Sequence, residues 1–130
     1  MDYIPEWAKV YFTRKELACH CCGELNISED FLYKLVTARK IAGIPFLMTS
    51  VCRCKKHNLE VTKKKDSHSK HRTDTIPNGT EAGDITARND SERGIISRAL
   101  FLAGIQQIGI NIDDKFIHCE EDSGYALWVY

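Results

Sequence analysis

The sequence predicts an α+β domain in which helices pack against a mainly antiparallel sheet. Two helical patterns come first, and three strand-like segments follow one another at the end of the chain. Helices and strands segregated in this way favour an α+β over an alternating α/β architecture. The 130 residues are enough for one hydrophobic core and too few for two. We therefore expect a single domain over residues 1–130.

Two helices near the start are indicated by their boundary residues. Thr13 and Glu16 form a capping box, which predicts a short helix that begins at Arg14. Ser28 is a favoured N-cap, and Gly43 is a favoured residue just beyond a helix end. The apolar stripe between these two residues predicts a second, longer helix.

A third helix and a shorter helical segment are expected further along. Ser91 and Glu92 open the third helix, which ends at Gly104. Its buried stripe is expected to consist of Ile95, Ile96, Ala99, Leu100 and Ala103. Residues 55–61 are compatible with one or two helical turns.

Five short segments have the composition or alternation of strands. They are residues 44–50, 81–87, 107–112, 115–120 and 126–130. Pro45 places the start of the first segment at a sheet edge or a bulge. Asp113 and Asp114 separate two of the segments and predict a hairpin turn. Residues 62–79 are polar and lysine-rich, so they form the longest predicted loop.

The charge balance excludes some classes of partner. Eighteen basic and eighteen acidic residues cancel, so we expect no nucleic-acid partner. A local basic cluster is interpreted as a solvated loop, although an anionic polymer is a conceivable surface partner; it consists of Lys55, Lys56, Lys63, Lys64, Lys65, Lys70 and Arg72. No apolar segment is long enough to span a bilayer, and the first residues lack a signal-peptide pattern. We expect no membrane partner and synthesis in the cytoplasm.

Three residues have the chemistry of a catalytic zinc site. His71, Asp84 and His118 supply two imidazoles and one carboxylate, which leave one coordination position for water. On the strand that carries His118, the two-residue period places Glu120 on the same face and Cys119 on the other. Glu120 could order a ligand or act on the bound water, whereas Cys119 is expected in the core.

Each candidate ligand also has an ordinary structural interpretation. His68 lies in the same loop as His71 and competes with it as a ligand. Taken alone, His118 could be a hydrogen-bonded histidine on a half-buried strand. Asp84 follows Gly83 and could be a turn residue.

The cysteines form a second group of interest. They are Cys19, Cys21, Cys22, Cys52, Cys54 and Cys119. Cys19-x-x-Cys22 has the spacing of a zinc-binding pair, and His57 lies close to Cys54 in the sequence. Packed thiols or one disulfide are the preferred interpretation over a second, structural metal.

Several short strings follow one another in a fixed order. They are Phe12-Thr13, Glu16-Leu17-Ala18-Cys19, Thr49-Ser50, Arg53-Cys54, His57-Asn58, Ser69-x-His71, Gly79, Ala82-x-Asp84-Ile85, Ile108-Gly109-Ile110, Phe116-Ile117-His118 and Leu127-Trp128-Val129-Tyr130. In this order they resemble the zinc D-Ala-D-Ala carboxypeptidase family, specifically its short phage-type peptidoglycan peptidases. That family shares a fold with the hedgehog signalling domain, so the resemblance implies a hedgehog/DD-peptidase-like fold.

The resemblance also implies roles for individual residues. His71, Asp84 and His118 would bind Zn²⁺. Arg53 would face the substrate, where its guanidinium binds a terminal carboxylate or polarises the scissile carbonyl. Ser69 would hydrogen-bond the substrate or support the first ligand. In the metallopeptidase pattern, zinc lowers the pKa of its water and a carboxylate accepts the proton.

The general base departs from the family pattern. Lys115 stands where better-known relatives carry the catalytic carboxylate. The base is therefore expected to be Asp114 or Asp113 through a shifted turn, or Glu120 from the other side of His118.

Two further departures concern the shape of the site. Asp84 follows His71 at a longer distance than in the family, which indicates an insertion in residues 72–78. The site survives only if this loop bulges outward and returns Asp84 to the metal. Cys52 stands where relatives often have an aromatic residue, which leaves the shape of the substrate pocket open.

The favoured function is a zinc peptidase that cuts peptidoglycan stem peptides, either at D-Ala-D-Ala or at an internal bond such as L-Ala-D-Glu. We expect a monomer that acts on the cell wall when it is released or carried by a virion. The alternative is a non-catalytic metal-binding module of a phage tail or lysis apparatus. A zinc-ribbon-like nucleic-acid binder is disfavoured by the neutral charge.

Overall fold

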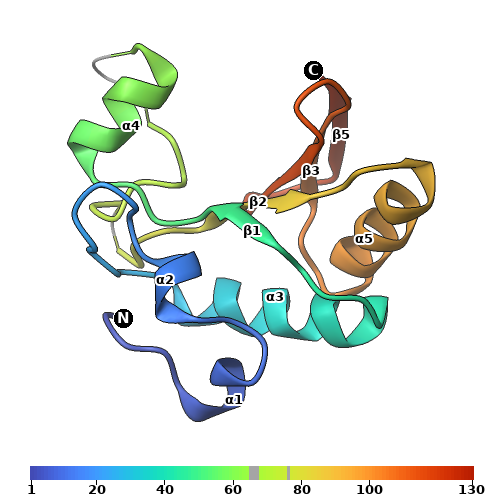
Figure 1. Ribbon diagram of the computed structural model, residues 1–130, viewed down its shortest axis with the longest axis horizontal. Coiled ribbons are helices and arrows are strands. Elements are labelled where there is room, and N and C mark those ends of the chain that lie inside the picture. The colour runs from blue at the N-terminus through green and yellow to red at the C-terminus, as the bar shows by residue number, and fades with distance from the viewer. Residues whose placement is uncertain (65–67, 76) are drawn as a thin grey trace.

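A computed structural model describes residues 1–64, 68–75 and 77–130 (Figure 1). Its helices are α1 (Glu6–Lys9), α2 (Arg14–Leu17), α3 (Glu29–Ala42), α4 (Lys55–Thr62) and α5 (Asp90–Leu102). Its strands are β1 (Met48–Ser50), β2 (Ala82–Thr86), β3 (Gln107–Asn111), β4 (Phe116–Glu120) and β5 (Ala126–Val129). Lys65 of the predicted basic cluster and parts of the predicted loop 62–79 lie outside the described residues.

The strands form one mixed, mostly antiparallel sheet in the order β1-β2-β4-β3-β5. All neighbouring strands are antiparallel except β3 and β5, which are parallel. The predicted α+β class with a mainly antiparallel sheet is therefore confirmed. The hairpin between β3 and β4 is also confirmed, and its turn ends at Lys115, which adopts a positive φ of 58°.

The register of the sheet separates a core face from a polar face. Asp84 of β2 lies directly opposite His118 of β4, which in turn lies opposite Gly109 of β3. Their neighbours Ile85 and Ile117 form the next pair and are fully buried. Because side chains alternate along a strand, the aliphatic pair faces the core, and the aspartate and histidine face the opposite side.

The core face is covered by the long helices α3 and α5, which pack against each other. In Figure 1, α3 and α5 lie on the lower and right sides of the view and α4 stands apart at the upper left. The predicted boundaries of α3 are confirmed. The Ser28 hydroxyl accepts a hydrogen bond from the Phe31 backbone at 3.2 Å, and Gly43 closes the helix with a φ of 69°.

The capping box of α2 is confirmed as well. The Thr13 hydroxyl accepts from the Glu16 backbone at 3.2 Å, and the Glu16 carboxylate accepts from the Thr13 backbone at 3.1 Å. The predicted turns at 55–61 form α4, for which the Cys54 side chain is the N-cap. Among the described residues, no helix is both long and apolar enough to cross a membrane.

Some predicted boundaries are wrong. The strand expected over 44–50 is confined to Met48–Ser50, because Pro45 has no N–H to donate and the pairing with β2 shifts register at the strand. Helix α5 begins one residue before Ser91, since Asn89 is its N-cap and accepts from the Glu92 backbone at 2.9 Å.

Two further differences concern single elements. Ile95 was expected on the buried stripe of α5, but it is 38% exposed. Consecutive residues on a helix point about 100° apart, so only Ile96 of this pair reaches the core. The short helix α1 follows Pro5 and carries no side-chain cap, which is why no boundary signal predicted it.

Candidate metal centre

Three polar side chains meet on the polar face of the sheet. The ligand atoms of His71, Asp84 and His118 all lie within 4.8 Å of one another. Nδ1 of His118 is 2.9 Å from Oδ1 of Asp84, and Nε2 of His71 is 3.4 Å from the same oxygen. The two imidazole nitrogens are 3.3 Å apart. Three donor atoms therefore converge on one point.

The outer nitrogens of both imidazoles are held by hydrogen-bond acceptors. Nδ1 of His71 lies 2.7 Å from the carbonyl oxygen of Val51, and Nε2 of His118 lies 2.8 Å from the Glu120 carboxylate. Since these oxygens can only accept, each outer nitrogen carries the proton in the neutral ring. With the outer nitrogens engaged in this way, the inner nitrogens are the ones that a metal would bind once they release any proton shared with Asp84.

The electrostatics of the cluster favour a negative Asp84. Although burial by itself raises the pKa of Asp84, hydrogen bonds from His118 and His71 hold it far below its usual range. Burial lowers the pKa of His71. Burial also acts to lower the pKa of His118, but its bonds to Asp84 and Glu120 raise that pKa to about 9. A carboxylate and imidazole nitrogens in a buried group are a donor set that fits a divalent metal ion.

Arg53 reaches the same cluster from the segment after β1. Its Nη2 lies 3.2 Å from Oδ2 of Asp84, on the oxygen that faces away from the histidines. Its Nε donates to the Ser50 hydroxyl at 2.9 Å. These two contacts hold the buried guanidinium beside the carboxylate and fix the direction of its fork.

The cluster lies in a cleft with a volume of about 700 Å³. Basic side chains of its lining are Arg53, Lys64, His68 and Lys70. Aromatic side chains are Phe116, Trp128 and Tyr130, and acidic side chains beyond Asp84 are Glu120 and Asp122. The cleft thus combines a candidate metal centre with cationic and aromatic walls.

Comparison with known proteins identifies the family. The family model described as peptidase M15 matches residues 10–120, which is most of the chain. The chain belongs to the peptidase M15 family. Searches of the curated proteins and of the solved structures each gave no significant match. Membership confirms the resemblance to the zinc D-Ala-D-Ala carboxypeptidase-like peptidases.

In this member of the M15 family, Ser69 and His68 occupy different positions relative to the cluster. The Ser69 hydroxyl accepts a hydrogen bond from the backbone of His71 at 3.3 Å and also lines the cleft. His68 is exposed at the rim, whereas His71 is only 2% exposed. The structure therefore brings His71, and not His68, into contact with Asp84.

The carboxylates predicted as general bases lie in different places. Glu120 lines the cleft next to His118. Asp113 and Asp114 lie in the exposed turn between β3 and β4, outside the lining that the described residues form. Asp122 lines the cleft but was not predicted, although the alternation that joins His118 to Glu120 would have extended to it.

The insertion between His71 and Asp84 is tied to its surroundings. The Thr73 backbone donates to the Arg53 carbonyl at 3.0 Å, and the Asn26 side chain donates to the Thr73 carbonyl at 2.7 Å. Gly79 has a φ of 82° and packs against Asn26 so closely that a Cβ would clash. These contacts anchor the described part of the loop, which then returns the chain to β2.

Trp128 is a neighbour of the cluster for which sequence reasoning assigned no role. Its ring lies 5.9 Å from the His118 ring, centroid to centroid. It reaches this position across Gly109, where a Cβ would come within 2.4 Å of the indole. Cys52, by contrast, is buried outside the described cleft lining, with its thiol 3.8 Å from the Asn26 carbonyl.

Proposed function

We propose that this protein is a zinc-dependent peptidase that hydrolyses the stem peptides of peptidoglycan. The observation that carries the proposal is the convergence of His71, Asp84 and His118 in a cleft of an M15 family member. Two imidazole nitrogens and one carboxylate form the usual three-residue set of catalytic zinc sites. When bound, zinc would lower the pKa of a water molecule and polarise the scissile carbonyl.

The protein groups around the cluster support specific roles. Val51 and Glu120 accept hydrogen bonds from the outer ring nitrogens, which directs the inner nitrogens toward the position of the metal. Of the three predicted bases, Glu120 is the one in the described lining of the cleft. We therefore assign to Glu120 the transfer of a proton from water to the leaving amine. His118 and Glu120 share the same strand face, which keeps these two tasks close together.

Arg53 is assigned to the substrate. Its guanidinium is directed by Ser50 and Asp84 and lines the cleft beside the cluster. A planar cation there can bind the free carboxylate of a stem peptide in a bidentate manner, or hold a carbonyl oxygen on which charge develops. The first mode favours release of a terminal D-Ala, and the second is equally suited to an internal L-Ala-D-Glu bond.

The deciding experiment is digestion of purified muropeptides by the zinc-loaded protein, with products separated by chromatography and identified by mass. Release of alanine from pentapeptide stems would identify a D-Ala-D-Ala carboxypeptidase. Separation of the stem after its first alanine would identify an L-Ala-D-Glu endopeptidase. His118→Ala is the matched inactive control. Zinc-bound wild-type protein that leaves all stem peptides intact would contradict the proposal.

One observation favours a second candidate, a non-catalytic metal-binding module of a phage tail or lysis apparatus. Lys115, at the position of the catalytic carboxylate in better-known relatives, lies in an exposed turn. If the cluster only binds metal, the wild-type protein will bind zinc at this site and cleave no muropeptide. In either case we propose that the protein reaches the cell wall by release from the cell or on a virion.

A further inference from the structure

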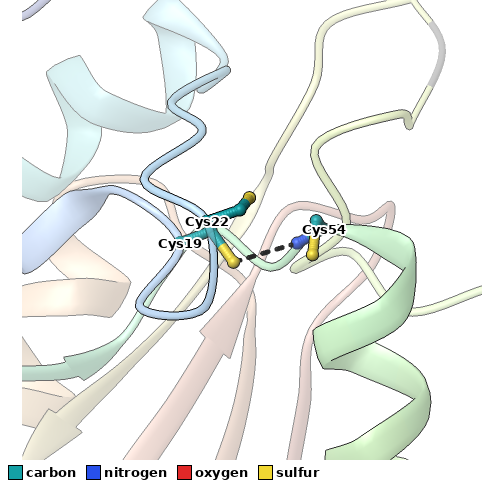
Figure 2. A group of neighbouring side chains, drawn as sticks. All are labelled: Cys19, Cys22 and Cys54. Carbon is teal, nitrogen blue, oxygen red and sulfur yellow. Dashed lines mark hydrogen bonds between the residues drawn. The ribbon is translucent and has the colours of Figure 1, made fainter.

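Three cysteine thiols meet at a second place, outside the lining of the cleft that the described residues form. The Sγ atoms of Cys19, Cys22 and Cys54 all lie within 4.8 Å of one another. Figure 2 shows that Cys19 and Cys22 come from the loop after α2, whereas Cys54 stands at the start of α4. All three are free thiols. Segments far apart in the sequence therefore place three soft ligands at one point.

The loop that carries two of these thiols is a tight turn. The Gly23 backbone donates to the Cys19 carbonyl at 2.7 Å, and Gly23 has a φ of 78° that L side chains rarely adopt. This turn closes the Cys19-x-x-Cys22 pair, whose spacing is that of metal-binding cysteine pairs. The turn therefore holds the two cysteines in the arrangement of a metal-binding Cys-x-x-Cys pair.

Backbone N–H groups point at the sulfur atoms. The Cys54 backbone donates to Sγ of Cys19 at 3.4 Å, as the dashed line in Figure 2 marks. The His57 backbone donates to Sγ of Cys54 at 3.4 Å. Such donors stabilise thiolates over thiols.

The three thiols of Cys19, Cys22 and Cys54 need a nearby positive charge to ionise together. Three neighbouring thiols cannot all ionise because their negative charges repel one another. A divalent cation between them removes this conflict.

The separation of the sulfurs suits a metal better than a disulfide. Zn–S bonds of about 2.3 Å in a tetrahedron place two sulfurs about 3.8 Å apart. Thiols within 4.8 Å of one another reach that arrangement by small side-chain movements. A disulfide would join two of the three sulfurs at about 2.05 Å and leave the third thiol unpaired among them.

We propose that Cys19, Cys22 and Cys54 bind a structural zinc ion, distinct from the ion held by His71, Asp84 and His118. A water molecule, or the exposed Cys21 of the same loop, completes the tetrahedron.

This second ion would stabilise the segment that carries Arg53 of the cleft. Cys54 directly follows Arg53, whose backbone donates to the His71 carbonyl at 2.8 Å. The preceding residue, Cys52, donates from its backbone to the Leu17 carbonyl at 3.0 Å. A metal ion that joins Cys54 to the loop of Cys19 and Cys22 would therefore hold the segment 52–54 in place. This segment positions Arg53 and contacts His71.

The test is a titration of the reduced, metal-free protein with Cd²⁺, followed by ultraviolet absorption. Thiolate ligands give a strong charge-transfer band with this soft ion, whereas imidazole and carboxylate ligands do not. We expect a band whose final amplitude corresponds to one three-thiolate site per chain in the wild-type protein. Cys22→Ser should lose most of the band, and because Cys22 is exposed this change should leave the fold intact by circular dichroism.

Two control variants separate this site from the other features of the protein. His118→Ala removes a ligand of the first site and should keep the band, so the test does not depend on peptidase activity. Cys119→Ala removes a buried thiol of β4 that is not in the cluster and should also keep it. A folded wild-type protein without the band, or a full band in Cys22→Ser, would overturn the proposal.

A measurement on the wild-type protein alone gives a second, independent readout. We expect zinc to slow the reaction of three thiols with a thiol reagent by about tenfold or more, and a chelator to restore their reactivity. Equal reactivity of all thiols with and without zinc, or a disulfide among these three cysteines in the purified protein, would also overturn the proposal.

Discussion

Glu120 and His118 are two residues apart on β4, and their side chains are joined by a 2.8 Å hydrogen bond. Strand alternation predicted that they share a face, because this period depends only on the extended backbone. The same reasoning could not decide among Glu120, Asp113 and Asp114 as the base. Their positions depend on where the strand begins and how the preceding turn is shaped, and these are set by pairing with β3.

Replacement of Glu120 by glutamine tests its proposed role as the base. The amide oxygen of Glu120→Gln can still accept the proton of His118 Nε2, so the metal content should remain that of the wild type. We expect kcat to fall by about 100-fold or more, because an amide cannot accept a proton from water. Steady-state kinetics on the cleaved muropeptide, with metal analysis of the same sample, measures both quantities.

Asp113→Asn is the matched control for this prediction. It removes the same charge from an exposed turn, and its kinetics should stay close to those of the wild type. A large loss of activity in Asp113→Asn with no loss in Glu120→Gln would assign the base to the turn instead.

At the scale of elements, the pairing of β5 with β3 brings an aromatic residue beside the site. The sequence predicted a final strand over 126–130 but not its parallel pairing with β3. That pairing places Trp128 opposite Gly109, where the indole passes close to the backbone and approaches the His118 ring. The missing Cβ of Gly109 is therefore a requirement of side-chain packing rather than of backbone conformation.

Gly109→Ala should destabilise the protein and disturb the cleft. The added Cβ would come within 2.4 Å of the Trp128 ring, so the indole must move. We expect the free energy of unfolding to fall by about 1–3 kcal/mol, as for other overpacked sites. Urea denaturation measures the loss, and tryptophan fluorescence reports the displaced ring.

Gly94→Ala is the opposite case in the same protein. Gly94 lies within α5, and a Cβ there would meet nothing within 4 Å. Because glycine weakens a helix interior, alanine should raise the free energy of unfolding by about 0.5–1 kcal/mol. Equal effects of the two substitutions would show that the indole does not constrain position 109.

At the scale of the whole molecule, the candidate metal centre joins three separate parts of the chain. His71 comes from the loop before β2, Asp84 from β2 and His118 from β4. A metal that binds these residues can bind tightly only to the folded chain, because the unfolded chain does not hold them together. Metal binding is therefore coupled to the stability of the fold.

Zinc should raise the thermal stability of the protein in a concentration-dependent way. At a free zinc concentration about 1,000 times the dissociation constant, one site contributes about 4 kcal/mol to the free energy of unfolding. Differential scanning calorimetry with added zinc or with a chelator measures this change. His118→Ala should lose the contribution of the first site, and identical transitions with zinc and chelator in the wild type would contradict the prediction.

The sequence by itself determined the α+β class, the caps of α2 and α3, and the residue types of the candidate metal centre. These features follow from local chemistry, since a cap or an alternating strand depends on residues only a few positions apart. Tertiary structure decided that the loop after His71 returns Asp84 to the cluster, that Asp113 and Asp114 stay outside the described cleft lining, and that Cys54 meets Cys19 and Cys22. These outcomes depend on strand register and on contacts between distant segments, which no local pattern specifies.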